Sequence, residues 1–411
     1  KSMVMKSVKL ASILFYLNSV FVVFCFVSCG SSPTEASSLL TADIRGGMDK
    51  PGLLGLGDEI KGVTFVPLEV TTDDASLIDG VYDYAVTDRY IYVLPVKEPR
   101  IVLFDRQGRF IRTLVKEGQG PGEFRGILPC IQVDERNDRL FLFSNNRVWE
   151  YTLEGEFIGQ STHEYSVIYM RHIGKDRFAA ISFPFQPFNG GGFGLGLFSR
   201  KGDTIAIKND FYSFLLPHEK SGFTTSIAPA YSDAQNSVLF KTGSNDTVFC
   251  ISADRISAAC VLDLKNSDAE VIRSLDVTDM SNLRIEKKDP KDIFVQDMIE
   301  FPGHYYFRLL YNQGYYIASV DKKTGKTLVE KCVMPGSIYE LADANLQHGM
   351  QGTRSYRNFP VWGRVIKDEL VQVVTPYELN LYKSLRSITI PQELDLKGEE
   401  GNPVFVFYSL I

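Results

Sequence analysis

The chain has five histidines that could carry out acid–base or metal chemistry, and they are scattered along the sequence. They are His163, His172, His218, His304 and His348. Protein zinc sites draw their ligands from compact patterns such as His-Glu-x-x-His, and no two of these histidines stand at such a spacing. His304 begins an apolar run typical of a strand, which favours a hydrogen-bonded structural histidine over a catalytic one. We therefore predict no metal site and no catalytic histidine.

Motifs for a nucleophile, a nucleotide or calcium are missing as well. The sequence has no Gly-x-Ser-x-Gly elbow and no Ser-x-x-Lys motif with its partner motifs. The glycine-rich run at 190–196 alternates glycine with apolar residues and continues into an apolar segment, which indicates a strand rather than a phosphate-binding loop. The acidic pairs at 73–74 and 399–400 lack the alternating oxygen ligands of a calcium loop. We expect no catalytic residue and no cofactor.

The six cysteines fall into two groups. Cys25 and Cys29 lie at the N-terminus, and the body of the chain holds Cys130, Cys250, Cys260 and Cys332. The four in the body show no Cys-x-x-Cys spacing, and a chain of this size can build a core without disulfides. We expect four buried free thiols. A disulfide between Cys250 and Cys260, which flank a predicted hairpin turn, is the alternative.

The N-terminus has the pattern of a processing signal. Lys1, Lys6 and Lys9 precede an apolar run at 10–27, which ends just before Cys29. A small residue followed by cysteine after such a run resembles a bacterial lipobox, although Phe26 stands where leucine is usual. We expect residues 1–28 to be a lipoprotein signal peptide, Cys29 to carry lipid, and residues 29–58 to begin with this cysteine and form a flexible tether. An uncleaved transmembrane helix, an ordinary secretory signal and a buried helix are the alternatives.

Charge excludes one class of partner. The chain has 44 Lys and Arg against 50 Asp and Glu, a formal net charge of −6. Binding to nucleic acid depends on clustered basic side chains that displace counterions, and the sequence has no such cluster. We expect no nucleic-acid partner. The expected partners are a membrane, reached through the lipid, and a protein, peptide or glycan.

The elements that would position a binding site come from a repeat. Segments beginning at Phe104, Tyr151 and Phe198 share an aromatic residue, a glycine and an isoleucine at a spacing of 47 residues (151 − 104 and 198 − 151). The three glycines are Gly108, Gly155 and Gly202. Alternating apolar residues around a polar turn with glycine are typical of a β-hairpin. Three hairpins in register predict a tandem array of β units.

A second pattern extends the array to six units. Six polar turns are each followed by a short apolar run, at 90–94, 140–143, 178–181, 238–240, 304–307 and 369–374. We also expect hairpins at 247–261, 315–330 and 378–390, with insertions such as 208–228 and 335–358 between units. Short helices are expected at 267–275 and 337–347. Strands therefore dominate every unit.

Units of about four strands with no helix between them exclude a parallel α/β sheet. Radial closure of six units leaves only short protected edges, so the sequence predicts an all-β, six-bladed β-propeller with four-stranded antiparallel blades over residues 59–411. A strand at 63–70 and another at 403–408 are expected to share one blade and close the ring. The body is thus one domain.

The segment Ile101–Phe124 resembles an NHL-type propeller repeat. With the lipobox and the C-terminal Asn-Pro-Val-Phe-Val-Phe-Tyr ending, the chain resembles the six-bladed β-propeller lipoproteins of Bacteroidetes over roughly 60–411. The resemblance implies a bacterial cell-envelope location, anchored by lipid to the outer membrane at its periplasmic or exterior face. Gly118, Gly120, Pro121 and Gly122 form a loop motif of the repeat, which we interpret as a structural turn because no helix follows to bind phosphate.

Two classes of function remain open on the sequence. The favoured one is a membrane-anchored, non-catalytic binding or scaffold propeller that recognises a protein, peptide or glycan through loops at one end. The alternative is a propeller hydrolase or lyase with a metal at the central channel, which would need carboxylates and histidines from several blades to converge on the axis. Tyrosine-rich stretches such as 305–316 would suit a stacking face for a glycan.

Overall fold

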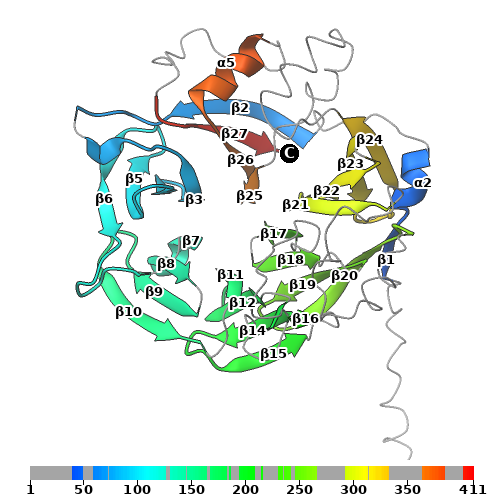
Figure 1. The fold of residues 1–411 in the computed structure, drawn as a ribbon, viewed down its shortest axis with the longest axis horizontal. Helices are drawn as coiled ribbons and strands as arrows, with labels where there is room; N and C mark the ends of the chain where they lie inside the picture. The colour runs from blue at the N-terminus through cyan, green and yellow to red at the C-terminus, as the bar shows by residue number, and fades with distance from the viewer. Residues whose placement is uncertain are drawn as a thin grey trace, which may run out of the picture. The chain divides into compact units, whose positions relative to one another are not determined.

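Six antiparallel sheets stand around a common axis as the blades of a propeller (Figure 1). The computed structural model describes residues 39–49, 59–72, 74–125, 130–144, 146–163, 167–182, 185–186, 194–208, 214–215, 230–234, 236–241, 246–265, 292–312, 314–332, 363–384 and 401–411. The unit they form begins at Leu40 and ends at Ile411. The expected all-β, six-bladed propeller is confirmed.

Each blade contains four strands, numbered here from the axis outward. Blades 1 and 2 contain β3 (Val81–Val86), β4 (Tyr90–Pro95), β5 (Arg100–Asp105), β6 (Phe110–Lys116) and β7 (Cys130–Asp134), β8 (Arg139–Ser144), β9 (Arg147–Tyr151), β10 (Phe157–Thr162). Blades 3 and 4 contain β11 (Val167–His172), β12 (Arg177–Ser182), β14 (Leu195–Ser199), β15 (Thr204–Lys208) and β17 (Ala230–Ala234), β18 (Ser237–Lys241), β19 (Thr247–Ser252), β20 (Ile256–Leu262). Blades 5 and 6 contain β21 (Phe294–Glu300), β22 (His304–Tyr311), β23 (Gly314–Asp321), β24 (Thr327–Cys332) and β25 (Arg364–Ile366), β26 (Glu369–Val374), β27 (Val404–Leu410), β2 (Ile60–Pro67). A separate pair, β13 (Phe185–Gln186) and β16 (Phe214–Leu215), lies outside the blades.

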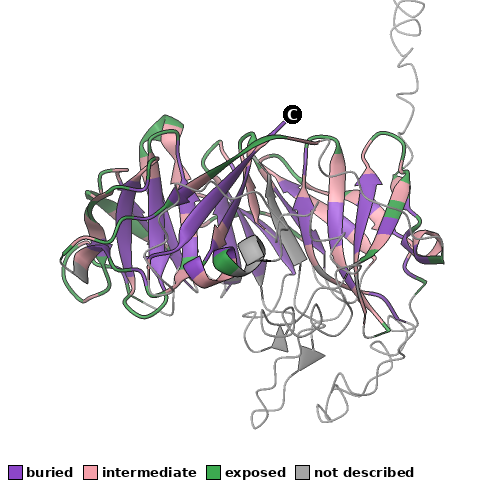
Figure 2. Ribbon diagram, turned by 90° about the horizontal axis from the view of Figure 1, so that it is seen from above, coloured by how far each residue is buried: buried purple, intermediate pink, exposed green. Residues whose placement is uncertain are grey.

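The six apolar runs expected from the sequence are the second strands of the six blades, β4, β8, β12, β18, β22 and β26. A second strand packs against a neighbouring blade on each face, so its residues are apolar without alternation. In β8, Leu140 and Leu142 are fully buried on one face, and Phe141 is buried on the other. Figure 2 shows the strands buried and the turns at their ends exposed. The apolar core is therefore a ring of layers between adjacent blades.

Tight turns join the third and fourth strands of the blades. Gly108, Gly155 and Gly202 sit in these turns with φ of 82°, 88° and 96°. This left-handed conformation strains any residue with a Cβ, which explains why glycine recurs at the spacing of 47 residues. At Gly108 a Cβ would also lie 2.2 Å from the carbonyl oxygen of Pro67.

The first and last strands of the propeller share blade 6. β2 pairs with β27 in an antiparallel register that sets Val63 opposite Tyr408 and Pro67 opposite Val404. The N-terminal strand thus supplies the outer strand of a blade whose other three strands come from the C-terminus. The expected closure is confirmed, and it leaves no blade with an incomplete sheet.

The hairpin expected at 378–390 is wrong. The structure has a helix there, α5 (Pro376–Ser384). Thr375 and Glu378 cap it reciprocally: the Thr375 amide donates to the Glu378 carboxylate at 2.6 Å, and the Glu378 amide donates to the Thr375 hydroxyl at 3.1 Å. Blade 6 needs no third-to-fourth hairpin of its own, because β2 is its fourth strand.

Two described elements lie inside the segment expected to be a tether. β1 (Leu40–Ala42) pairs in parallel with β20 as a fifth strand of blade 4, and α2 (Ile44–Asp49) follows it. Ile44 is fully buried and joins the apolar cluster between blades 4 and 5. Burial of Ile44 holds residues 40–49 of the expected tether on the propeller, whereas its residues 29–38 and 50–58 lie outside the described ranges.

Cysteines in the described blades carry free thiols. Cys250 faces Ser257, and Cys260 faces Val248, so the two thiols do not meet across the hairpin. Both are free, and the alternative of a disulfide between them is wrong. Burial raises the pKa of the Cys260 thiol to about 12, which keeps it protonated and unreactive at neutral pH.

Several expected features lie outside the described residues. They are Cys29 with the signal segment, the helices at 267–275 and 337–347, His218 and His348. Among the helices of the described ranges, none has the length and hydropathy required to span a bilayer.

Candidate functional site

The two faces of the propeller differ in the connections that they carry. Turns between strands 1 and 2 and between strands 3 and 4 are two to five residues long and share one face, which we name the tight-turn face. Connections between strands 2 and 3 and between consecutive blades share the other, which we name the long-loop face. Connections of 20 residues or more begin and end there, at 209–229, 263–293, 333–363 and 375–403. The fold thus concentrates its sequence insertions on one face.

Ion pairs between blades occupy the tight-turn face. Lys367 of blade 6 reaches Glu135 of blade 2 at 2.7 Å and also pairs with Asp88 of blade 1. Arg112 of blade 1 binds Glu154 of blade 2 at 2.6 Å. Further pairs join Arg106 to Glu369 and Lys175 to Asp254. These charges neutralise one another across blade boundaries, so this face holds neighbouring blades in register.

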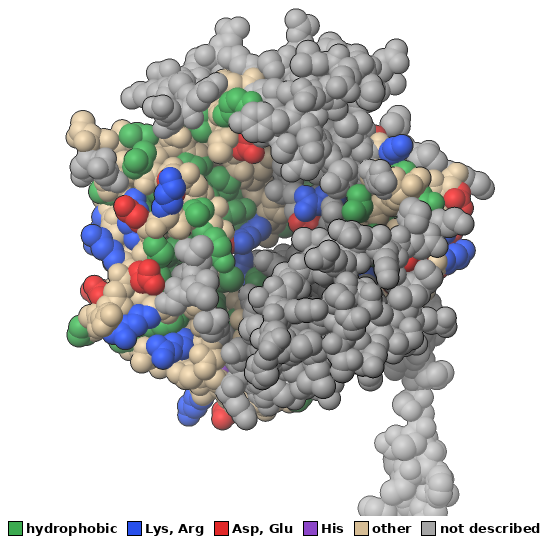
Figure 3. All heavy atoms as spheres, viewed as in Figure 1, with side chains coloured by type: hydrophobic (Ala, Val, Ile, Leu, Met, Phe, Trp, Pro, Cys, Tyr) green, Lys and Arg blue, Asp and Glu red, His purple; other side chains and the backbone are tan. Residues whose placement is uncertain are grey.

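The long-loop face of blade 1 exposes apolar side chains beside the axis. Leu77, Tyr82 and Val96 are 43%, 45% and 46% exposed. Leu77 precedes β3, Tyr82 lies at its start, and Val96 follows β4, which pairs with β3. Figure 3 views this face and shows hydrophobic side chains gathered beside the central opening. An aromatic residue with two apolar neighbours offers a contact surface that a polar turn does not.

A buried ion pair joins the innermost strands behind this patch. Asp83 of β3 is 3% exposed, and its carboxylate pairs with Arg364 of β25 at 2.5 Å. The other carboxylate oxygen accepts the Ile131 amide of β7 at 2.7 Å. Arg171 of β11 then donates to the Ile131 carbonyl at 2.8 Å. The first strands of blades 6, 1, 2 and 3 are thus linked in sequence around the axis.

These contacts explain why the charged groups near the axis do not form a metal site. Both oxygens of Asp83 are already engaged, one by a guanidinium and one by a backbone amide. No group of three or more His, Cys, Asp or Glu side chains in the described ranges could hold a metal ion. Burial raises the pKa of the neighbouring Tyr84 to about 12, so its hydroxyl stays protonated and donates to the Val371 carbonyl at 2.8 Å.

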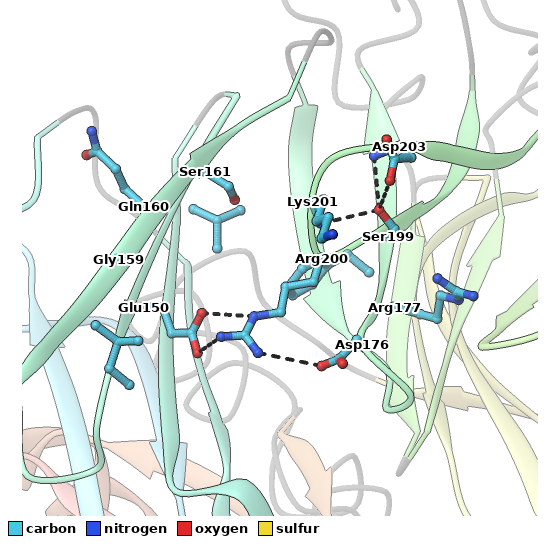
Figure 4. A pocket seen from close by; sticks show the side chains of 13 residues that line it. Glu150, Gly159, Gln160, Ser161, Asp176, Arg177, Ser199, Arg200, Lys201 and Asp203 are labelled. Carbon is cyan, nitrogen blue, oxygen red and sulfur yellow. Dashed lines mark hydrogen bonds and ion pairs between the residues drawn. The ribbon is translucent and has the colours of Figure 1, made fainter.

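A cleft of about 630 Å³ lies between blades 2 and 3 (Figure 4), and we name it the blade 2–3 cleft. Its walls are the outer strand β10 of blade 2 and the tight turns of blade 3. At its base Glu150, only 8% exposed, pairs with Arg139 at 2.6 Å and with Arg200. Arg200 in turn approaches Asp176 at 3.8 Å. A buried carboxylate held by two guanidinium groups gives this cleft a fixed polar floor.

The described histidines have structural surroundings. His163 packs edge-on against Phe198, and burial lowers the pKa of its imidazole. Burial also lowers the pKa of His172, while the charge of Asp134 opposes that shift. His304 lies 2.7 Å from Glu59, which also accepts the Tyr306 hydroxyl at 2.7 Å. None of the three lies in the blade 2–3 cleft.

The loop motif at 118–122 bonds chiefly to itself. The amide of Gly120 donates to the Glu123 carboxylate at 2.7 Å, and the Glu123 amide donates to the Gly120 carbonyl at 3.1 Å. Gly122 adopts φ of 81°, and Pro121 precedes it. The Arg125 side chain donates to the carbonyls of Gly118 and Gln119. The loop lies on the long-loop face and leads from blade 1 to blade 2.

The cleft and its buried carboxylate were not predicted from the sequence. Glu150 stands 47 residues from both Leu103 and Leu197 (150 − 103 and 197 − 150), so two apolar residues occupy its position in the neighbouring blades. The residues that recur at this spacing identify the glycines of the turns. Glu150 would be identified by the difference between repeats, because it is charged where the neighbouring blades have leucine.

Comparisons with known proteins agree with this architecture. Residues 39–409 match the family model described as "Domain of unknown function (DUF4934)". The chain is similar to a "Putative exported protein" of Bacteroides fragilis, with a TM-score of 0.63 at 15% identity over 90% of this chain and 99% of that chain. A protein of unknown function from Bacteroides caccae matches at a TM-score of 0.33 and 12% identity, over 61% of this chain and 81% of that one. BamB from Moraxella catarrhalis matches at a TM-score of 0.34 and 10% identity, over 66% and 68%. Comparison with curated proteins gave no match.

Proposed function

The chain belongs to the DUF4934 family, and from that premise we propose that it is a non-catalytic binding propeller of the bacterial cell envelope. The partner is a protein, peptide or glycan, and it docks on the long-loop face. The propeller serves as a rigid platform, and the long connections and the apolar patch of blade 1 provide the contacts.

The observation that carries this proposal is the difference between the two faces. On the tight-turn face, short turns are joined by ion pairs between blades, such as Arg112 with Glu154 and Arg106 with Glu369. On the long-loop face, where the connections of 20 residues or more begin and end, Leu77, Tyr82 and Val96 are each more than 40% exposed. Binding residues concentrate on loops that a rigid scaffold positions, and exposed aromatic residues anchor interfaces.

Membrane attachment through Cys29 is the second part of the proposal. It is supported by the sequence pattern of basic residues, an apolar run and a cysteine. The similar Bacteroides fragilis protein is described as exported, which fits an envelope protein. Because β1 fixes the chain to blade 4 at Leu40, the tether would end at the rim of the propeller. A rim attachment leaves the long-loop face open to a partner.

The alternative of a metal-dependent hydrolase or lyase has no supporting observation in the described blades. Asp83, a buried carboxylate on the innermost strand of blade 1, is held by Arg364 and the Ile131 amide. A binding role does not require a carboxylate that is available to coordinate a metal.

Photo-crosslinking from defined positions tests the proposal. Benzoylphenylalanine placed at Tyr82, on the long-loop face, is expected to yield a discrete crosslinked species in intact cells. The same amino acid placed at Lys323, an exposed residue of a blade 5 tight turn, is the matched control and should yield none. Crosslinks from Lys323 alone, or from neither position, would overturn the assignment of the binding face.

A further inference from the structure

The boundary between blades 2 and 3 differs from the boundary between blades 1 and 2, and the 47-residue repeat identifies the equivalent residues at the two boundaries. β5 sets Leu103 opposite Arg112, and β9 sets Glu150 opposite Gly159. Both pairs are related by the spacing of 47 residues (150 − 103 and 159 − 112). Each pair faces the next blade along the ring. The two boundaries can therefore be compared residue by residue.

Between blades 1 and 2 a side chain fills the gap at the outer strands. Arg112 extends from β6 to the Glu154 carboxylate in the turn of blade 2, at 2.6 Å. Leu114 lies beside it, close enough that a Cβ at Gly155 would come within 3.1 Å of the Leu114 Cβ. An ion pair and an apolar side chain thus occupy this boundary.

Between blades 2 and 3 the same positions are small. Gly159 stands where Arg112 would be, since Glu150 and Leu103, their partners on the third strands, are equivalent in the repeat. Ser161 pairs with Val148, and the equivalent of Val148 in blade 1, Ile101, pairs with Val115, so serine replaces valine at that position. A Cβ added to Gly159 would meet nothing within 4 Å. The missing side chains leave the blade 2–3 cleft, of about 630 Å³, which lies in the range of protein sites for small ligands.

The charge opposite the gap is also reversed. Lys201 occupies the turn position of Glu154 (201 − 154 is 47), so a cation faces the space that Gly159 leaves empty. No hydrogen bond or ion pair joins the Lys201 ammonium to any other residue in the described ranges. Figure 4 shows Lys201 and Ser161 on opposite walls of the cleft. Arg112 of blade 1 is the charged partner of Glu154 in the turn of blade 2. Gly159 of blade 2 provides no such partner for Lys201 in the turn of blade 3.

We infer that the blade 2–3 cleft binds an acidic saccharide, whose ring carboxylate pairs with Lys201. A ligand carboxylate beside Lys201 would form an ion pair at the position equivalent to that of Arg112 and Glu154, with Lys201 as the cation. The floor of the cleft is already neutralised, since Glu150 binds Arg139 and Arg200. The Lys201 ammonium therefore remains for the ligand.

A sugar acid fits the remaining lining better than an acidic peptide does. Asp176, whose side chain is 71% exposed, and Asp203 offer carboxylates that accept hydroxyl donors. Gln160 and Ser161 offer an amide and a hydroxyl that can bond ring hydroxyl groups. The aromatic residue of the lining, Phe178, is fully buried and presents no face for stacking. Val148 and Ile158 add an apolar part to the lining, so the cleft suits a ligand that combines an apolar ring face with several hydroxyl groups and one carboxylate.

This site is separate from the proposed long-loop face, because blade 3 contributes its tight turns to the cleft. Its test is therefore independent of the crosslinking result. The full chain is titrated calorimetrically with digalacturonate, with its dimethyl ester and with triglutamate. Digalacturonate is expected to bind, and the ester, which keeps the shape but lacks the charge, should bind about tenfold or more weakly. Binding of triglutamate with equal affinity, or no binding of digalacturonate, overturns the inference.

Two variants localise the binding. Lys201→Gln should weaken digalacturonate binding about tenfold, whereas Lys323→Gln, in a tight turn of blade 5, should leave it unchanged. Gly159→Asp places a carboxylate of the protein into the open space opposite Lys201, so it should abolish binding. Unchanged near-ultraviolet circular dichroism of Gly159→Asp would show that the fold is retained. Full digalacturonate affinity in a folded Gly159→Asp variant would contradict the proposed site.

Discussion

Asp83 of blade 1 and Arg364 of blade 6 form a buried ion pair at the axis, with 2.5 Å between the carboxylate and guanidinium groups. The pair joins the innermost strand of a blade built early in the sequence to the innermost strand of the blade that β2 and β27 complete. The Asp83 side chain is only 4% exposed, so removal of Arg364 would leave a charge with little access to solvent; the Arg364 side chain is 26% exposed, so removal of Asp83 would leave a partly buried cation.

Asp83→Ala is expected to lower the free energy of unfolding by about 3 kcal/mol, because the Arg364 guanidinium loses its carboxylate partner and keeps the Tyr84 carbonyl, while the Ile131 amide loses its acceptor. Chemical denaturation measures the change. Glu154→Ala breaks the pair with Arg112. Both side chains are about half exposed, so the free energy of unfolding should fall by less than about 1 kcal/mol. Equal losses of unfolding free energy in the two variants would show that the axial pair contributes no more to stability than an exposed pair does.

Two glycines of the repeat should respond in opposite directions to alanine. Gly159→Ala should raise the free energy of unfolding by about 0.5–1 kcal/mol, because a Cβ meets open space there and the unfolded chain loses freedom. Gly108→Ala should be destabilising, since φ is 82° and the Cβ would lie 2.2 Å from the Pro67 carbonyl oxygen. Thermal unfolding of both variants gives the comparison. A stabilised Gly108→Ala variant would mean that this turn adopts another conformation.

Stability should fall in mild acid because of His163. Burial lowers its pKa below the usual 6.5, so the unfolded chain binds a proton more readily than the folded protein does. The free energy of unfolding is therefore expected to fall as pH drops from about 6.5 through the folded-state pKa, by up to about 1.4 kcal/mol per pH unit. His163→Phe, which keeps the edge-on ring contact with Phe198, should reduce this slope. His172 should account for the remainder, because its pKa is lowered too. An identical slope in His163→Phe would exclude His163 as the cause.

Membrane attachment is expected to depend on Cys29. Cys29→Ser removes the thiol that would accept lipid, so the protein should move from the membrane fraction to the soluble fraction after cell breakage. Immunoblots of both fractions measure the shift. Cys250→Ser, a change to a partly buried thiol within blade 4, is the matched control and should leave the distribution unchanged. Retention of Cys29→Ser with membranes would contradict the lipid anchor.

The propeller architecture could be predicted from the sequence because the same structural requirements recur in successive blades. Gly108, Gly155 and Gly202 each need a left-handed conformation in the same turn, so their spacing of 47 residues is visible in the sequence. The apolar runs of the second strands follow from burial on both faces. Closure by β2 and β27 was predictable because each is an apolar strand without a partner near it in the sequence.

Features that break the repeat escaped prediction. The repeat suggested a hairpin where α5 forms, although Thr375 and Glu378 stand at capping-box spacing. β1 is three residues long, too short to show a periodicity, and Ile44 is buried by contacts with distant blades. The blade 2–3 cleft arises from Gly159, where the informative fact is a side chain that is absent. Such a site is found by asking where equivalent positions of the repeat differ, and the structure shows that this difference leaves a cleft.

Protection of the long-loop face in intact cells tests the account most directly. Val96→Cys places a thiol on that face at a position 46% exposed, and Lys323→Cys places one on the tight-turn face as the matched control. Both are labelled with a membrane-impermeant maleimide after the outer membrane is opened, with the parent chain as background for the native thiols. The account predicts that Val96→Cys reacts more slowly in cells than as purified protein, whereas Lys323→Cys reacts equally in both. Equal labelling of Val96→Cys in cells and in isolation, or protection at Lys323→Cys alone, would contradict binding at the long-loop face.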